Sequence, residues 1–247
     1  GVLDCGSYAL STDLSSAPQI DDLSLDSEDP LKRWELRDSQ VEGVNTYTLS
    51  SLETADGARL DPYVTGWIGV AESATLVIDA DTHLLFSPEH NSGIWVDGVI
   101  KIHGTDKKQV IMTSARDPQV GGVGQPSAGD WGGLHINHAL PEETVISWLE
   151  MRYAGGTENT CLRLRDASPR LENVSIAHCA SYPISSLATA QPVIENLTLS
   201  DNALGNVWEI QATNMTERRT WLWEPVDLAD GSILTRRITG RILIDKE

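Results

Sequence analysis

Two ten-residue segments repeat one another position by position, and this repeat constrains the fold more than any other sequence feature. Ser168 to Ala177 reads SPRLENVSIA, and Gln191 to Ser200, 23 residues further on, reads QPVIENLTLS. The apolar columns of the two segments coincide: Leu171 with Ile194, Val174 with Leu197, and Ile176 with Leu199. A repeat of this kind that carries strands and no helix can bury its apolar face only by winding into stacked coils, about 4.8 Å apart. The sequence therefore predicts an all-β fold, a parallel β-helix.

The same pattern extends to neighbouring segments. At an offset of 25 residues Ile146, Leu149 and Met151 join the three columns, and Leu164, Leu187 and Ile210 predict a further column. Short alternating strands are expected at Thr75 to Ile78, Leu84 to Phe86, Ile94 to Val96, Val99 to His103 and Val110 to Thr113. We expect coils of about 22 to 25 residues over 46–210, an irregular N-terminal cap or extension over 1–45, and a capping segment over 211–247.

Several motifs in order give a family resemblance. ATLVIDADTHLLF (Ala74 to Phe86), IWVDGVIKIHGT (Ile94 to Thr105), VIMTSA (Val110 to Ala115) and GDWGGLHI (Gly129 to Ile136) are followed by the repeat above. Read together, they resemble bacterial secreted or surface proteins with a pectate-lyase-like solenoid and a "GDWGGI"-type motif. The chain departs from the family pattern at two places: it has Ala80, Asp81 and Thr82 where the family has a Pro-Gly-Thr turn, and Met112 where the family has an aromatic residue. The resemblance implies a right-handed parallel β-helix.

The charge balance limits the partners. The chain has 36 acidic and 18 basic residues, a net charge of -18, which repels phosphate backbones, anionic lipids and polyuronates. We therefore expect no nucleic-acid partner and no membrane insertion. Gly1 to Leu14 lacks the basic start and apolar middle of a signal peptide, so any signal would lie outside this sequence, which we expect to be part of a secreted or cell-surface protein.

The three cysteines predict neither a zinc site nor an obvious disulfide. Cys5, Cys161 and Cys179 match no zinc spacing. Cys161 and Cys179 are 18 residues apart, whereas vertically adjacent positions are about 23 apart, so they should lie out of line on neighbouring coils. Bridged Cα atoms must lie within about 7 Å. We therefore expect no Cys161–Cys179 bond.

The only concentrated basic surface predicted in this acidic chain supplies the candidate binding site. Its ligand-binding residues would be Arg152, Arg163, Arg165 and Arg170. In an enzyme, Arg152, Arg163, Arg165 and Asp166 would be the candidate catalytic residues, because a lyase on this fold needs a base beside a uronate and a hydrolase needs paired carboxylates. Outward charges on strands are also common without any function.

Other polar and aromatic residues are expected to be structural or on the surface. His135, His138 and His178 have no acidic ligand at a fixed spacing, so we expect surface histidines and predict no metal site and no cofactor; no motif indicates calcium. Asn173 and Asn196 should form a hydrogen-bonded ladder, and Trp131 an apolar plug whose indole N–H reaches a carbonyl. Ser114 to Asp130 is rich in Gly and Pro and should bulge out as a long loop, either a binding loop or a tolerated insertion.

Three functions fit these observations. The first is a non-catalytic extracellular β-helix module, adhesin-like or structural, that binds a polysaccharide or a cell-surface protein through one long face and the Ser114 to Asp130 loop. The second is a carbohydrate-active enzyme, either a polysaccharide lyase or a glycoside hydrolase. The third is a structural spacer of a longer chain. The absence of a recognisable acid, base and cation set favours the first.

Overall fold

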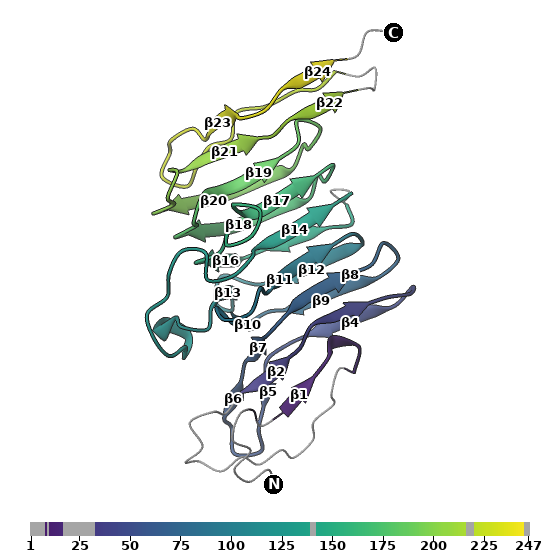
Figure 1. Ribbon diagram of the computed structural model, residues 1–247, viewed down its shortest axis with the longest axis vertical. Coiled ribbons are helices and arrows are strands. Elements are labelled where there is room, and N and C mark those ends of the chain that lie inside the picture. The colour runs from purple at the N-terminus through teal and green to yellow at the C-terminus, as the bar shows by residue number, and fades with distance from the viewer. Residues whose placement is uncertain (1–7, 9, 17–32, 139–141, 216–219, 245–247) are drawn as a thin grey trace.

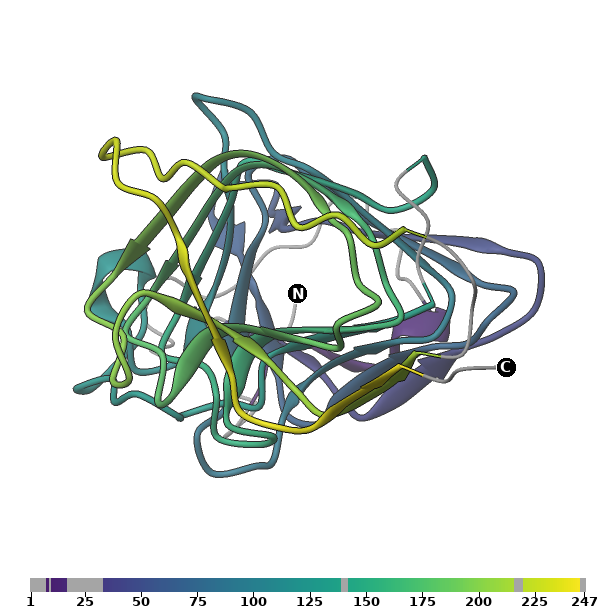
Figure 2. The same ribbon diagram turned by 90° about the horizontal axis from the view of Figure 1, so that it is seen from above.

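The computed structural model describes residues 8, 10–16, 33–138, 142–215 and 220–244. It is an all-β parallel solenoid of about eight turns, which rises in chain order from the purple N-terminal strands to the yellow C-terminal ones (Figure 1). Seen from above, successive coils lie over one another around a common axis (Figure 2). The predicted parallel β-helix is confirmed.

Two large sheets form the walls. The 12-stranded sheet contains, in order, β1 (Leu10–Thr12), β2 (Trp34–Leu36), β7 (Pro62–Val64), β10 (His83–Phe86), β13 (Val110–Ser114), β16 (Leu149–Arg152), β18 (Arg170–Ala177), β15 (Val145–Ser147), β12 (Val99–His103), β9 (Thr75–Asp79) and β4 (Thr46–Leu49), with β20 (Val193–Ser200) paired to β18. The 8-stranded sheet contains β23 (Thr235–Ile238), β21 (Val207–Ile210), β19 (Tyr182–Ser186), β17 (Thr160–Arg165), β14 (Leu134–Asn137), β11 (Gly93–Val96), β8 (Trp67–Val70) and β3 (Ser39–Val41).

The remaining elements are short. β22 (Thr213–Met215) pairs with β24 (Ile242–Ile244) in parallel, and β5 (Leu52–Glu53) pairs with β6 (Arg59–Leu60) in antiparallel orientation. The described residues also include two 3₁₀ turns, η1 (Leu14–Ser16) and η2 (Pro118–Val120).

The repeat that predicted the fold pairs in the predicted register. β18 and β20 align Leu171 with Ile194, Val174 with Leu197, and Ile176 with Leu199. Five of these side chains are buried, and Ile194 is partly buried against the same core. The first half of β18 pairs with β15 and the second half with β16, so one strand serves both arms of the 12-stranded sheet.

An asparagine ladder marks the bend between those arms. Asn173 and Asn196 have φ of 54° and 57°, a left-handed conformation that Asn tolerates better than most residues. The Asn196 side-chain amide donates to the Asn173 side-chain oxygen at 3.0 Å, so the predicted ladder is confirmed.

One predicted column is wrong by a residue. Leu164 pairs with Ser186, and Ser186 pairs with Ile210, so Leu187 is not in the column. The spacing is therefore 22 and then 24 residues instead of 23 twice. Ser186 is buried in place of the expected leucine. Its hydroxyl oxygen is satisfied there, because it accepts a hydrogen bond from the Trp208 indole N–H at 2.9 Å.

Parallel pairing also extends beyond the expected boundaries of the solenoid. β2 and β3 lie within 1–45, yet they pair with β7 and β8 in register. At the other end, β23 continues the 8-stranded sheet beside β21 and β24 pairs with β22. The described parts of both terminal segments therefore contribute strands to the stack.

Trp131 is the predicted plug. Its side chain is 1% exposed and stacks on Phe86 with ring centroids 4.0 Å apart. Its indole N–H donates to the Arg152 carbonyl at 2.8 Å. Leu, Ile and Val side chains make up most of the surrounding core, because the chain has few aromatic residues with which to fill it.

The predicted absence of a Cys161–Cys179 bond is wrong. The two cysteines form a disulfide with their Cα atoms 5.8 Å apart. Our expectation assumed that neighbouring coils run straight past one another. Instead the chain turns sharply between β18 and β19, where His178 has a φ of 55°, and this corner returns Cys179 to the start of β17.

Candidate functional site

The structure does not bring the candidate basic residues together. Arg152 lies in β16 of the 12-stranded sheet, whereas Arg163 and Arg165 lie in β17 of the 8-stranded sheet. Arg170 lies in β18, where it pairs with Glu172 and, at 2.8 Å, with Glu195. The four arginines therefore do not form one continuous surface.

Arg152 is buried by the long loop. Its side chain is 8% exposed, and its guanidinium lies 3.1 Å from a carboxylate oxygen of Asp117 and 3.5 Å from one of Glu150. Asp117 is 1% exposed; it caps η2 by accepting from the Gln119 amide and also accepts from the Thr113 hydroxyl at 2.8 Å. This arginine holds the loop onto the sheet instead of facing solvent.

The same loop is fixed at its other end. The Asp130 carboxylate accepts from the Ser114 hydroxyl at 2.5 Å and from the Ser127 amide at 3.0 Å. The predicted long loop over Ser114 to Asp130 is thus confirmed, and the two carboxylates, Asp117 and Asp130, fold it back against the solenoid.

The remaining candidates are on or near the surface. Arg163 is 15% exposed in its side chain and pairs with Glu158 at 2.8 Å. Arg165 is exposed, and Asp166, also exposed, accepts from the Thr189 hydroxyl at 2.5 Å. None of these contacts joins a carboxylate to a second acid or to a base in the arrangement that glycosidic cleavage requires.

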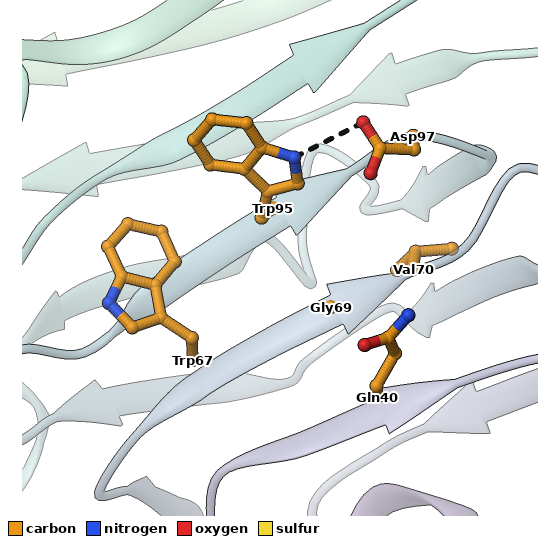
Figure 3. Close-up of a pocket in the computed structure, with 6 residues that line it drawn as sticks. All are labelled: Gln40, Trp67, Gly69, Val70, Trp95 and Asp97. Atoms are coloured by element: carbon orange, nitrogen blue, oxygen red, sulfur yellow. Dashed lines mark hydrogen bonds between the residues drawn. The ribbon is translucent and has the colours of Figure 1, made fainter.

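The outer face of the 8-stranded sheet carries a notch that sequence reasoning missed (Figure 3). It encloses about 280 Å³ and is lined by Gln40, Trp67, Gly69, Val70, Trp95 and Asp97. We call it the Gly69 notch.

The notch exists because one row of outward side chains is interrupted. Gln40, Gly69 and Trp95 are successive in-register positions on β3, β8 and β11. Gly69 has no side chain, so a gap remains between its two neighbours. A Cβ atom placed on Gly69 would meet the Gln40 side chain at 3.4 Å, an ordinary contact, so the backbone itself does not require glycine here.

Two tryptophans form apolar walls beside the gap. Both are half-buried, and their rings meet edge to face at 70° with centroids 6.4 Å apart. The Trp67 ring lies against backbone: a Cβ atom on Gly93 or on Gly132 would come within 2.7 Å of it. These two glycines allow the indole to lie across the neighbouring coils.

A fixed carboxylate lies on the far side of the notch. One Asp97 oxygen accepts from the Trp95 indole N–H at 3.2 Å and from the Asn137 amide at 2.7 Å (Figure 3 draws the first of these bonds). These two bonds orient the carboxylate and hold Trp95 in place. With Gln40 opposite, the notch offers one amide and one carboxylate to a ligand.

His135 supports the tryptophans from the next strand. The expectation of a surface histidine is wrong here: His135 is 1% exposed, because the two indoles cover it. It lies next to Trp95 in register, and its ring centroid is 5.4 Å from those of both Trp67 and Trp95. Neither ring nitrogen has a hydrogen-bond partner of good geometry. Burial lowers the pKa of His135 to about 4; the Arg163 guanidinium acts in the same direction and the Gly132 backbone in the opposite one. The imidazole is therefore neutral at pH 7.

A second, smaller hollow lies beyond Trp67 where three coil corners meet. It encloses about 140 Å³ and is lined by Pro88, Glu89, His90, Asn91, Gly129, Asp130, Trp131, Gly132, Gly156 and Thr157. We call it the Thr157 hollow. The Thr157 hydroxyl donates to the Asn91 side-chain oxygen at 2.8 Å across it.

The described residues hold no group of three or more His, Cys, Asp and Glu side chains that could bind a metal ion. The same residues include no helix of the length and hydropathy that spanning a bilayer demands.

A periodicity signal in the sequence could have located the two tryptophans of the notch, although not the gap between their coils. Trp67 and Trp95 alternate with buried residues in WIGV and IWVD, which places both indoles on the outer face of adjacent coils.

The chain was also compared with known proteins: no protein-family model, no curated protein and no solved structure matches it.

Proposed function

We propose that the chain is a non-catalytic β-helix module of an extracellular or surface protein, related to bacterial β-helix surface proteins, and that it binds neutral glycan at the Gly69 notch. The observation that carries this proposal is the pair of half-buried tryptophans beside a gap that is flanked by the oriented Asp97 carboxylate and the Gln40 amide. Aromatic faces pack against the apolar C–H faces of pyranose rings, while an amide and a carboxylate bind hydroxyl groups.

The charge of the chain favours a neutral sugar. Asp97 is an acceptor when ionised, so it suits a donating hydroxyl group and repels a uronate. The net charge of -18 acts in the same direction over longer distances.

The disulfide supports an extracellular location. Disulfides persist in secreted and surface proteins and are rare in reducing compartments. Cys161 and Cys179 are fully buried, as expected of a structural bridge.

The test is a binding panel of neutral oligosaccharides of glucose, mannose, galactose and xylose, measured by calorimetry and by tryptophan fluorescence. We expect at least one series to bind, and Gly69→Val to abolish binding by filling the notch while leaving the melting temperature unchanged or higher, because valine favours strands. Thr198→Val, at an exposed outward position of β20, is the matched control.

Two results would contradict the proposal. One is the absence of binding to every neutral series; the other is full binding by Gly69→Val. Release of reducing ends or of an unsaturated product from any sugar in the panel would instead indicate an enzyme.

A further inference from the structure

The Thr157 hollow lies beside the Gly69 notch, with one shared tryptophan between them. Trp67 lines the notch, and its ring also lies against Gly132, which lines the hollow. The indole thus forms a bridge of apolar surface from one depression to the other.

The separation of the two depressions exceeds one sugar ring. The notch is centred on Gly69 in β8, whereas Gly129 to Gly132 precede β14, two coils further along the 8-stranded sheet. Two coil steps amount to about 10 Å along the axis. A ligand that reaches both must therefore be an oligomer.

The walls of the hollow are built from backbone that cannot shift easily. The Gly132 amide donates to the Ser92 carbonyl at 2.7 Å, and the Gly156 amide donates to the Trp131 carbonyl at 2.9 Å. A Cβ atom on Gly156 would lie 2.2 Å from the Gly129 carbonyl oxygen, so the corners pack closely only because these residues are glycines. The hollow is consequently formed before any ligand arrives.

The polar groups around the hollow match hydroxyl groups better than they match an anionic group. Thr157 and Asn91 can each donate and accept, and the exposed Glu89 is an acceptor when ionised. The carboxylate of Asp130 is already bonded within the loop. An anionic sugar would meet repulsion here as it would at Asp97.

We propose that the Thr157 hollow is a second subsite of the glycan site, so that the protein binds a neutral oligosaccharide that crosses Trp67 and occupies both depressions. This inference rests on the proposed function. It adds that the ligand is an oligomer, that its affinity depends on chain length, and that Asn91 and Thr157 bind its distal ring.

The experiment measures the dissociation constant for one to six rings of each neutral series in the panel. The parent should bind the longer members on the order of tenfold more tightly than the single ring, the gain expected from about 1.4 kcal/mol at a second subsite. The double variant Asn91→Ala, Thr157→Val should lose this gain and bind the single ring like the parent. Gly69→Val should abolish binding at every length, and Thr198→Val should change nothing.

The outcomes separate the two proposals. Length-independent binding, or an unchanged length dependence in the Asn91, Thr157 double variant, would overturn the second subsite and leave the Gly69 notch standing. Failure of every length to bind would overturn the glycan function itself. Circular dichroism and the melting temperature of each variant confirm that the solenoid is folded.

Discussion

Asp117 in the long loop and Arg152 in β16 form an ion pair of 3.1 Å in which both side chains are almost completely buried. Asp117 and Arg152 are 35 residues apart in sequence, and the loop covers the outer face of the sheet where Arg152 would otherwise meet solvent. The contact explains why an arginine predicted to bind ligand instead binds the protein itself.

Removal of one member of this pair should destabilise the fold. Asp117→Ala leaves a buried guanidinium without its closest carboxylate and also removes the cap of η2, so we expect a loss of about 3 to 5 kcal/mol of unfolding free energy. Arg165→Ala, at an exposed position, should change it by less than about 0.5 kcal/mol. Urea denaturation of both variants checks the difference, and equal effects would show that the pair contributes little.

Reduction of the disulfide should also lower stability. Cys161 and Cys179 close a loop of 18 residues, for which the chain-entropy model gives about 3 kcal/mol. Denaturation curves with and without reductant, recorded on a Cys5→Ser background, test this expectation. A non-reduced peptide digest without the Cys161–Cys179 crosslink would contradict the bond.

The core columns give a third prediction. Leu197→Asp should cost several kcal/mol, because Leu197 is fully buried and a charge there has no partner. Thr198→Asp, one residue along the same strand but exposed, should cost far less. Thermal melts of the two variants compare the faces of β20 directly, and similar melting temperatures would refute the assigned register.

His135 should make stability depend on pH. Its folded pKa of about 4 lies below the ordinary value of 6.5, so the unfolded chain binds more protons between these two values. The contribution of His135 to the free energy of unfolding is therefore fully present above about pH 6.5. It is lost progressively as the pH falls toward 4, by about 3 kcal/mol at most.

The control for this pH dependence is His135→Phe, which keeps an aromatic ring between the tryptophans and cannot titrate. The parent should lose more unfolding free energy than this variant between pH 7 and pH 4.5. Parallel curves for the two proteins would show that His135 is not responsible.

The arginines of β17 give the last prediction. Arg163 forms an ion pair with Glu158, and Arg165 is exposed beside it on the same strand. We therefore expect neither the parent nor the double variant Arg163→Ala, Arg165→Ala to bind acidic oligosaccharides. Arg165 is exposed and contributes little to folding, whereas the Arg163 side chain is 15% exposed, so any fall in melting temperature should come from Arg163. A salt-sensitive rise in melting temperature with an acidic oligosaccharide, lost in the double variant, would contradict this.

The fold could be predicted because the evidence for it is local and repeated. Leu171, Val174 and Ile176 define inward positions, and their alignment with the next coil fixes the register without any knowledge of loops. Leu187 shows the limit of this reasoning: one residue gained or lost at a corner shifts a column, and corner length is not encoded in strand alternation.

The site was harder to predict because it depends on what covers each outward residue. Arg152 has the alternation of a surface residue, and only the path of the Ser114 to Asp130 loop buries it. The corner at His178 similarly determines whether Cys179 can reach Cys161. Trp67 and Trp95 were predictable in orientation, but the importance of Gly69 between them appears only when three coils are placed side by side.

The row that contains Gly69 also bears on how such a surface can change during evolution. Each coil contributes one residue to the row, so Trp95 and His135 remain neighbours although a loop has been inserted between them in the sequence. A substitution on one coil, or a duplication of a whole coil, can therefore alter the surface at one position and leave the adjoining positions as they were. Ligand preference in a scaffold of this kind can be modified stepwise, with little risk to the hydrophobic interior.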